Sequence, residues 1–428
     1  MNSKKREFLS FDRSMLAQCL LLYIGICAGL WINKICLALV AGFTVLTAMF
    51  GKRDSVYHQL FFCLPFTMVY KLSPGTTSLF IYAMLAAGVF LIIRNFSFKK
   101  PQLFFIVLFA VYICIGMGRR VTTVIKMIMA LTLFLIFVKK TDSENFKNHI
   151  MSFSLGMLGS SFIGLLKGSW PRLDMYFSDM NPIYVDGERS FRFSGLYLDP
   201  NYYSISAIFA VTLCIMLFLY KKGNRVLLGT VIIALSIFGF ISYSKMFLVS
   251  YLLMIVFFIM WALKSPKKII SVSVVASVGG WFLYKWMQSS SYLAVMLDRF
   301  SGEDVSTGRF GIWESYIGYI KSSPLTFLFG DGLGAPYYNS VGPHNTYIES
   351  VYFIGLLGSI IFLVALISIF RARRYVFKRS IINYALILIF LGMIATLGCL
   401  TVNDLMFYCM LLWISLNMSK ERTVVNYD

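Results

Sequence analysis

The chain has 428 residues, of which 58% are hydrophobic and 14% are charged, and its mean hydropathy is +0.75. Soluble proteins carry roughly 25% charged residues, so this composition excludes an ordinary soluble protein and indicates a polytopic membrane protein. The formal net charge of +20 also suggests a nucleic-acid-binding protein, but the positions of the cations along the chain argue against that class.

Apolar segments of about 16 to 20 residues recur along the chain, and each is long enough to cross the hydrocarbon core of a bilayer as a helix. The segments 35–50 and 56–71 give the weakest signals, and the second contains Pro65, so a count between twelve and fourteen is expected. In chain order the candidate spans are 14–31, 35–50, 56–71, 77–93, 102–118, 121–138, 149–167, 201–219, 226–243, 246–263, 269–287, 346–370, 381–399 and 403–419.

The basic residues are concentrated in alternate loops. If the N-terminus is cytoplasmic, the inner loops and both termini collect 25 of the 39 Lys and Arg residues but 7 of the 19 acidic residues. Only this orientation places every short basic loop on one side, as the positive-inside rule requires. The charge therefore orients the protein in a membrane and does not indicate binding to DNA or RNA. The first span is predicted to be an uncleaved anchor rather than a signal peptide.

The predicted fold class is an all-α polytopic membrane protein, a bundle of about 12–14 transmembrane helices. A single integral membrane domain covers residues 1–428, with two long extracytoplasmic loops at 168–200 and 288–345. The second loop is expected to contain a short amphipathic helix. All eight cysteines fall inside predicted spans, so we expect no disulfide framework and expect them to pack as small apolar residues.

Three cations lie at the outer ends of the fifth and sixth spans, against the orientation bias. Arg119 and Arg120 stand between these spans, and Lys126 lies one to two turns into the sixth. Arg119 and Lys126 are seven residues apart, so they share a helix face. A charge within a span costs about 2.5–3.5 kcal/mol on insertion scales. Two interpretations stay open: snorkelling to lipid headgroups, or a cationic wall for an anionic substrate.

The first long outer loop ends in a polar stretch, Arg189–Asn201. Its Asp199-Pro200-Asn201 segment is expected to end an extended stretch and to cap the next span, because Asn at a helix N-terminus accepts bonds from otherwise unpaired N–H groups. Arg192 has no such structural explanation. It lies on the outer side, beside Gly195, which allows close backbone approach. We expect any chemistry in this stretch and in the second outer loop.

In the second outer loop, Thr307 is the expected N-cap of a helix of about three turns. Its apolar face is predicted at Phe310, Trp313, Ile317 and Ile320. The helix is too short to span a membrane, so we expect it to lie in the interface or to close over a cavity. Arg309 stands at its start, where the helix dipole disfavours a cation. An anion bound between that N-terminus and the guanidinium would explain the placement.

His344 is the histidine expected to face outward. His58 and His149 fall near the inner ends of spans, where we expect contacts with solvent or lipid headgroups. His344 precedes the span at 346–370, and the positive end of that helix dipole disfavours its protonation. A neutral imidazole there could accept a proton near pH 7. The residue chemistry alone leaves two interpretations, a headgroup contact and a catalytic base.

These features occur together in one arrangement. From His344 the chain reads His-Asn, nine further residues, and Gly355-x-x-Gly358, preceded by Gly308-Arg309, Trp313, Pro324 and Gly332-x-Gly334. This resembles the signature of the O-antigen ligase and Wzy-type polysaccharide polymerase superfamily, in which a large outer loop before a late span carries it. The Arg-Phe-x-Gly and Asp-Pro-Asn of the 192–201 segment are similar to the superfamily's earlier loop. The N-terminal half matches only as a series of spans.

The resemblance implies a substrate class and a site. The substrates would be glycans carried on undecaprenyl pyrophosphate at the outer face of a bacterial plasma membrane, joined by an inverting glycosyl transfer with no metal or cofactor. Arg192 and Arg309 would grip the pyrophosphate, since arginine offers permanently charged, bidentate donors, and His344 would deprotonate or orient the attacking sugar hydroxyl. The substrate-binding residues expected beside them are Arg119, Arg120, Lys126, Arg189, Asp199, Asn201, Asn345 and Asp404. The expected partners are donor and acceptor glycans, the bilayer and a chain-length regulator, and no nucleic acid.

One departure separates the two activities of this superfamily. Lipopolysaccharide ligases continue the final glycine with Thr-Arg-Pro, whereas Ser359-Ile360-Ile361 follow here. This favours a polymerase, whose acceptor is another lipid-linked repeat unit, over a ligase, whose acceptor is lipid A core.

Three other classes are weighed against this hypothesis. A lipid-linked oligosaccharide flippase would place ionisable residues or broken helices near the midplane, often in repeated halves, and the sequence has no internal repeat. A metal-dependent glycosyltransferase would need an acidic pair in an early outer loop, and no Asp-x-Asp occurs in the chain. Serine or cysteine chemistry has no support, because no Cys lies outside a predicted span and only His344 could partner a Ser.

Overall fold

The computed structural model describes residues 11–73, 75–95, 100–115, 121–167, 173, 182–185, 188–263, 265, 281, 284–285, 288, 292–301, 308–373, 381–400 and 404–418. Its elements are α2 (Arg13–Trp31), α3 (Ile35–Phe50), α4 (Arg53–Cys63), η1 (Leu64–Phe66), α5 (Leu79–Arg94), α6 (Lys100–Ile115), α7 (Val121–Lys140), α8 (Phe146–Gly164), β1 (Pro182–Val185), β2 (Glu188–Phe191), α10 (Pro200–Leu219), α11 (Arg225–Phe240), α12 (Lys245–Ala262), α14 (Tyr292–Ser301), α15 (Arg309–Ser322), α16 (Pro324–Phe329), η3 (Tyr338–Ser340), α17 (Thr346–Phe370), α18 (Ile382–Thr396) and α19 (Asp404–Asn417).

The protein is helical, as its composition predicts. Within the described residues, five helices are long and apolar enough to cross a membrane: α2, α7, α10, α12 and α17. The shorter apolar helices α3, α5, α6, α11, α18 and α19 coincide with further predicted spans. The predicted span at 269–287 lies mostly outside the described residues. A small departure from an all-α fold is the antiparallel pair β1–β2, in which Tyr184 is the partner of Arg189.

The helix at the predicted span 56–71 differs most clearly from its predicted bounds. The helix begins earlier, at Arg53, and ends at Cys63, and Pro65 lies in the short turn η1. Proline lacks the N–H that a continuing helix needs, so the helix stops short of the predicted end at residue 71. Every residue from Val56 to Cys63 is buried, and α4 therefore packs inside the bundle.

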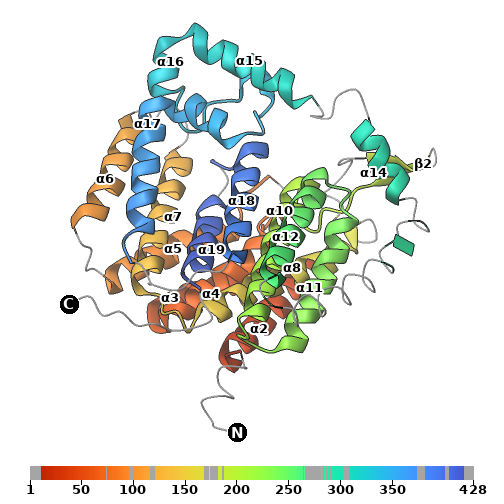
Figure 1. Cartoon of the computed structure of the whole chain (residues 1–428). Helices are drawn as coiled ribbons and strands as arrows, with labels where there is room; N and C mark the ends of the chain where they lie inside the picture. The colour runs from red at the N-terminus through yellow and green to blue at the C-terminus, as the bar shows by residue number, and fades with distance from the viewer. Residues whose placement is uncertain are drawn as a thin grey trace.

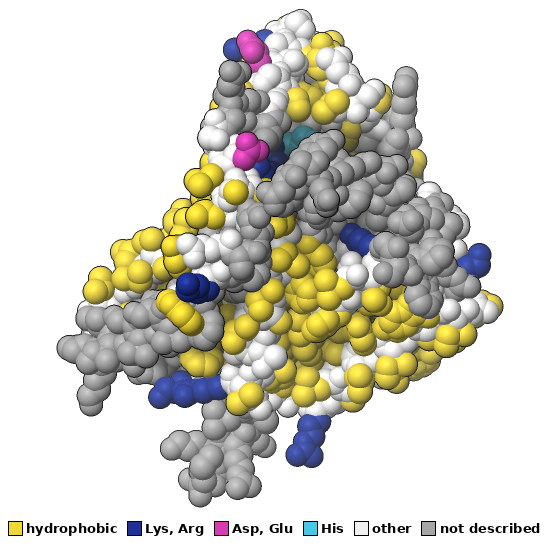
Figure 2. Space-filling model, turned by 90° about the vertical axis from the view of Figure 1, so that its right-hand side faces the viewer, with side chains coloured by type: hydrophobic (Ala, Val, Ile, Leu, Met, Phe, Trp, Pro, Cys, Tyr) yellow, Lys and Arg dark blue, Asp and Glu magenta, His cyan; other side chains and the backbone are white. Residues whose placement is uncertain are grey.

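The two ends of the bundle differ in construction. Helices α15 and α16 lie at the top of Figure 1, α14 and the hairpin lie at its upper right, and the apolar helices extend below them. Helices α8, α10 and α19 are buried along most of their length. Peripheral helices expose large apolar side chains, such as Leu39, Phe50 and Ile93, and Figure 2 shows a wide hydrophobic surface below the upper end. Exposed apolar surface of this extent indicates contact with lipid.

At the opposite end, arginines connect loops that were predicted to lie on one side. Arg94 donates to the carbonyl oxygens of Ala48 (2.8 Å) and Gly51 (2.9 Å), at the C-terminus of α3. Arg373 donates to the carbonyls of Lys139 (3.2 Å) and Thr141 (3.1 Å), at the C-terminus of α7. Cations at helix C-termini satisfy unpaired carbonyls and complement the helix dipole. The basic loops after α3, α5, α7 and α17 thus share one end of the bundle.

The expectation for two histidines is wrong. His58 and His149 do not contact solvent or headgroups but are buried between α4 and α8, with ring centroids 4.5 Å apart. The reason is the close packing of α4 against α8. On α7, the Phe137 ring also lies 5.2 Å from the His149 ring. A position near a helix end does not give access to water when another helix covers it.

Candidate functional site

The first part of the site is the loop before α10, which carries Arg192. Its Nε donates to the Ser242 carbonyl (3.0 Å), and one Nη donates to the Asn201 side chain (3.1 Å). The same Asn201 oxygen accepts from the Ser244 hydroxyl (3.1 Å). These bonds hold the guanidinium plane against the α11–α12 turn and the start of α10. They use two of the five N–H donors of an arginine, so the others remain for a ligand.

A close backbone contact fixes the course of this loop. Gly195 has φ +50°, and a Cβ on Gly164, at the end of α8, would lie 2.7 Å from the Gly195 backbone. The prediction that Gly195 permits a close approach is therefore confirmed. The Phe193 ring stacks on the Phe238 ring, with centroids 5.2 Å apart, and this packing holds the segment that follows Arg192.

The cap of α10 differs in one residue from the expectation. The side chain of Asp199 accepts from the Asn201 backbone N–H (2.6 Å), and Pro200 occupies the first turn. Asp199, and not Asn201, is therefore the N-cap, as suits a carboxylate at the positive end of a helix dipole. Asn201 points its side chain to Arg192 and Ser244 instead.

The second part of the site is α15, which begins at Arg309 as the sequence predicts. Gly308, with φ +82°, takes the N-cap position without a side-chain cap, and the expected cap Thr307 lies outside the described residues. The predicted apolar face is only partly correct. Phe310 is 66% and Ile317 40% exposed, whereas Tyr316 and Ile320 are buried.

The third part is a break in α17. Gly355 has φ +65° and ψ 178°, so the helix is interrupted there. The interruption frees backbone carbonyls, and those of Tyr352 and Phe353 accept from the N–H groups of Asp331 (2.8 Å) and Gly332 (3.0 Å). A Cβ at Gly355 would collide with the Leu328 carbonyl, so glycine is required where the 330–334 turn inserts. The glycine signature therefore fixes the second outer loop onto α17.

His344 lies at the end of that loop, directly before α17. The loop is tied to α15, because the Trp313 indole donates to the Pro343 carbonyl (2.8 Å) and the Tyr316 hydroxyl donates to the Val341 carbonyl (2.6 Å). His344 itself has φ +47°, a left-handed conformation that is costly for a side chain with a Cβ and is found preferentially at functional sites.

Asn345 has a structural task. It is the N-cap of α17, and its side chain accepts from the N–H groups of Tyr347 (2.9 Å) and Ile348 (3.2 Å). Its side-chain oxygen is occupied by these bonds and the residue is buried, so Asn345 fixes the start of α17 directly after His344.

The charges of the three parts act on one another. Burial lowers the pKa of His344 below its usual range, Arg309 lowers it further, and Asp199 opposes them. Burial lowers the pKa of Arg192 to about 10, with Arg299 and Arg309 acting in the same direction and Asp199 against them. Since charge–charge interactions fall off with distance, these effects indicate that Arg309 lies near both Arg192 and His344 and that Asp199 lies near all three.

This neighbourhood is strongly cationic. Burial lowers the pKa of Arg309, and the Asp199 carboxylate and the Tyr202 phenol oppose that shift. Ion pairs between described residues join Arg53 to Asp54 and Arg373 to Asp142, and neither of them involves Asp199. In Figure 2 a histidine lies beside basic side chains near the upper end. A cluster of partly buried guanidiniums with a single carboxylate nearby is suited to a multiply charged anion.

Arg299, on α14, is a residue of this cluster that the sequence reasoning missed. It acts on Arg192 electrostatically, and its Nη1 atom is buried without a hydrogen-bond partner in the described structure. Burial lowers its pKa, with Tyr292 opposing. A buried, unpaired N–H of a charged group is unfavourable, and a bound anion would satisfy it. The available signal was a cation in an outer loop, which by itself selects no single residue.

Several predicted binding residues are not brought to this cluster. Arg119 and Arg120 lie outside the described residues, as does the side chain of Arg189 on β2. Lys126 is half-buried on α7, which packs against α5, α6, α17 and α19. Asp404 begins α19, where it contributes, after burial, to raising the pKa of the Tyr197 phenol. No described contact joins Asp404 to the arginines.

Besides Arg299, the sequence prediction also missed an acidic residue. Glu349, in the first turn of α17, is fully buried. Its carboxylate accepts from the Tyr337 hydroxyl (2.9 Å) and the Leu400 N–H (2.9 Å). It fastens the second outer loop and the α18–α19 connection to the helix that follows His344.

Neither metal ligands nor relatives define the site further. Among the described residues no group of three or more His, Cys, Asp or Glu side chains is placed to hold a metal ion. No family model matches the chain, and neither the curated proteins nor the solved structures contain a significant match to it.

Proposed function

We propose that this protein is a polysaccharide repeat-unit polymerase of a bacterial plasma membrane. It transfers a glycan from undecaprenyl pyrophosphate to another lipid-linked repeat unit at the outer face. The observation that carries the proposal is the convergence of Arg192, Arg309 and His344, from two outer loops more than 100 residues apart in the chain, at one end of an apolar bundle. The resemblance of the same residues to the O-antigen ligase and polymerase superfamily supplies the substrate class.

The chemistry follows from the charges. The bond between the anomeric carbon and the diphosphate oxygen breaks, and its electron pair leaves with the diphosphate. Arg192, Arg299 and Arg309 offset that developing charge through bidentate, charge-assisted bonds in a partly desolvated site. The acceptor hydroxyl forms the new bond to the anomeric carbon and gives its proton to His344, which Arg309 and burial keep neutral. The donors are in place before substrate binds, because Arg192 is held by Ser242 and Asn201.

The membrane topology belongs to the same proposal. Both termini and the basic loops at Arg94 and Arg373 are cytoplasmic, and α14, α15, α16 and the hairpin are extracytoplasmic. The shared position of the basic loops at one end and of these elements at the other supports it. Fourteen spans, counting the short α4–η1 segment and the 269–287 span, fit this alternation.

The test is complementation of a gene deletion with His344→Ala and, separately, Arg309→Lys, followed by gel analysis of the surface glycan. Arg309→Lys retains the charge but loses the bidentate geometry. We expect both variants to leave a product of a single repeat. Lys321→Ala, an exposed cation on the same helix, is the matched control and retains full-length glycan.

The gel separates the alternatives. A ligase variant accumulates long chains that stay on the lipid carrier, and a flippase variant leaves the repeat unit at the cytoplasmic face. Normal glycan from both variants at wild-type protein levels would show that the assigned site is wrong.

A lipid-linked oligosaccharide flippase is the second candidate, and the break of α17 at Gly355 favours it, since transporters use discontinuous helices. Here, however, the freed carbonyls of Tyr352 and Phe353 are bonded to the 330–334 turn and do not line an ion site. A repeat unit that still reaches the outer face in the His344→Ala strain would exclude the flippase.

A further inference from the structure

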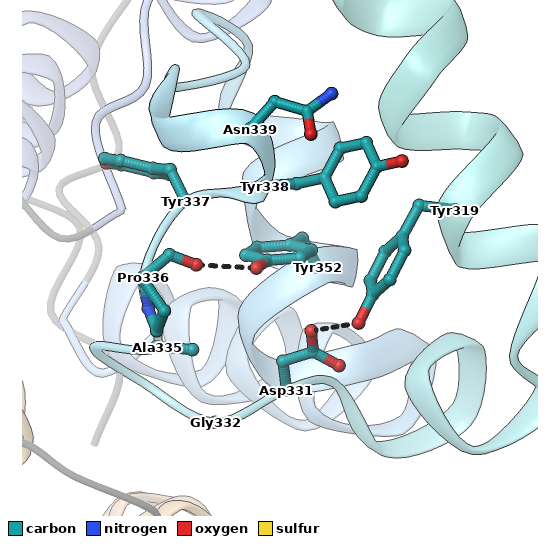
Figure 3. Close-up of a pocket in the computed structure, with 9 residues that line it drawn as sticks. All are labelled: Tyr319, Asp331, Gly332, Ala335, Pro336, Tyr337, Tyr338, Asn339 and Tyr352. Atoms are coloured by element: carbon teal, nitrogen blue, oxygen red, sulfur yellow. Dashed lines mark hydrogen bonds between the residues drawn. The ribbon is translucent and has the colours of Figure 1, made fainter.

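The second outer loop lines a cavity. It has a volume of about 600 Å³ and lies between α15, the loop after Asp331 and the first turns of α17. Small-ligand sites fall in roughly the range of 300–1,000 Å³. Four tyrosines, Tyr319, Tyr337, Tyr338 and Tyr352, face this cavity together with Asp331 and Asn339 (Figure 3).

The aromatic rings are held in fixed positions. The Tyr352 hydroxyl donates to the Pro336 carbonyl (2.7 Å), and the Tyr319 hydroxyl donates to an Asp331 carboxylate oxygen (2.8 Å). The Tyr319 and Tyr338 rings stack with centroids 4.6 Å apart. In Figure 3 the Tyr352 ring lies between Tyr337 on one side and Tyr319 on the other. Rigid, electron-rich ring faces bind the polarised C–H groups of a sugar ring at little cost in side-chain entropy.

The polar groups of the cavity match hydroxyls. One Asp331 oxygen accepts from Tyr319 and the other from Thr326 (2.8 Å). Each carboxylate oxygen has a second acceptor position, so Asp331 can accept two further hydrogen bonds from hydroxyl groups. Asn339 adds an exposed amide. Asn339 and Ser340 have φ values of 51° and 60°, and consecutive left-handed residues that carry a Cβ are a strained arrangement that clusters at ligand sites.

The charge of the cavity separates it from the arginine cluster. Among the described residues that line it, one is a carboxylate and none is Lys, Arg or His. An anionic group such as a diphosphate or a uronate would face Asp331 without a cation to offset the repulsion. The lining therefore selects an uncharged, hydroxyl-rich ligand.

The cavity and His344 share one rigid loop. Tyr316 bonds the Val341 carbonyl, and Trp313 bonds the Pro343 carbonyl, so α15 supports both the cavity wall and the approach to His344. We propose that this tyrosine pocket binds a neutral sugar of the acceptor glycan. The identity of that sugar as part of the acceptor rests on the proposed function. The binding of a neutral saccharide by the pocket is independent of the proposed function.

The test is a binding measurement without lipid or pyrophosphate. The probe is the neutral oligosaccharide released by mild acid from the surface polysaccharide of the strain that encodes the protein, and saturation-transfer NMR with the full chain in detergent micelles reports contact. We expect wild-type binding, at least tenfold weaker binding by Tyr338→Ala and Asp331→Asn, and wild-type binding by His344→Ala. An exposed tyrosine on α5 provides the control variant, Tyr82→Ala, which should bind as wild type.

The outcomes are separable. Absence of saccharide contact in the wild type, or equal contact in Tyr338→Ala and Asp331→Asn, overturns the pocket. Tyr319→Phe, which keeps the ring but loses the bond to Asp331, distinguishes lost binding from lost folding, since we expect it to retain stacking and to bind several-fold more weakly. Saccharide binding together with normal polymer in His344→Ala would instead contradict the proposed function while leaving the pocket in place.

Discussion

The arginines at the two ends of the bundle are used differently. At one end, Arg94 and Arg373 donate to carbonyl oxygens at the C-termini of α3 and α7. At the other end, Arg309 stands at a helix N-terminus, where the dipole opposes its charge, and Arg299 has a buried nitrogen without a partner. The first pair stabilises the fold through satisfied bonds. The second pair is electrostatically unfavourable in the free protein, and the anion of the proposed substrate would offset this cost.

This contrast predicts that activity and stability separate by location. Arg309→Ala should lower the rate of glycan transfer per folded molecule by about 10²–10³-fold, the usual effect of removing one preorganised donor from a developing negative charge. Its thermal unfolding temperature should stay within a few degrees of wild type, because no described hydrogen bond of the guanidinium is lost. Transfer from a lipid-linked donor by the purified protein measures the first quantity, and unfolding in detergent the second.

Lys321→Ala is the control on the same helix, with no expected change in either quantity. A loss of folded protein that accounts for the whole loss of activity in Arg309→Ala would remove the contrast between the two ends.

Arg299→Ala should show a smaller loss of activity and a gain of stability. A charge-assisted hydrogen bond contributes about 1.5–3 kcal/mol, so transfer should fall by about 10- to 100-fold. Removing a buried unpaired donor should raise the unfolding free energy by roughly 1 kcal/mol. The pair of measurements used for Arg309 applies. A destabilised Arg299→Ala variant with unchanged activity would assign this arginine to the fold instead.

Arg94→Ala should have the reverse profile. It removes two bonds to carbonyls at the end of α3, so we expect a loss of about 1–2 kcal/mol of stability and unchanged transfer per folded molecule. Denaturation in detergent and activity normalised to folded protein check the two parts. Loss of activity in a folded Arg94→Ala protein would place function at both ends.

The sequence predicted the parts of the fold that depend on continuous composition. Apolar runs gave the order of the helices, and the basic loops gave the end that Arg94 and Arg373 share. The break at Gly355 was not predicted as a break, because hydropathy is the same whether an apolar run is straight or interrupted. What interrupts it is a distant segment, the 330–334 turn, whose insertion becomes visible only in three dimensions.

The site was predicted where one residue type carries the chemistry and missed where packing decides. Arg192, Arg309 and His344 stood out as polar residues in unexpected positions, and Arg309 lowers the pKa of each of the other two. Arg299 did not stand out, because only its burial distinguishes it from other loop cations. The predicted apolar face of α15 did not include Tyr316, whose ring is buried and whose hydroxyl donates to the Val341 carbonyl.

The pH dependence gives the finest test of whether the two outer loops meet. Burial and Arg309 lower the pKa of His344 below the ordinary histidine value of about 6.5. A base must be neutral, so kcat/KM should be flat near pH 7 and should fall only at a pH below about 6.5. The same shift means that the unfolded state takes up this proton first as the pH falls, so the His344 contribution to stability decreases below pH 6.5.

Removing the charge of Arg309 should move the pH at which kcat/KM falls on the acidic side of the profile, here called the acid limb. In Arg309→Ala the positive charge that opposes protonation is gone, so the pKa of His344 should rise and the acidic side of the kcat/KM profile should shift to higher pH. Lys321→Ala should leave the limb in place. This shift is small, but it depends only on proximity and charge and not on the absolute rate. An unmoved limb in an active Arg309→Ala protein would show that the guanidinium and the imidazole do not share a site, whatever the two substitutions do to the rate.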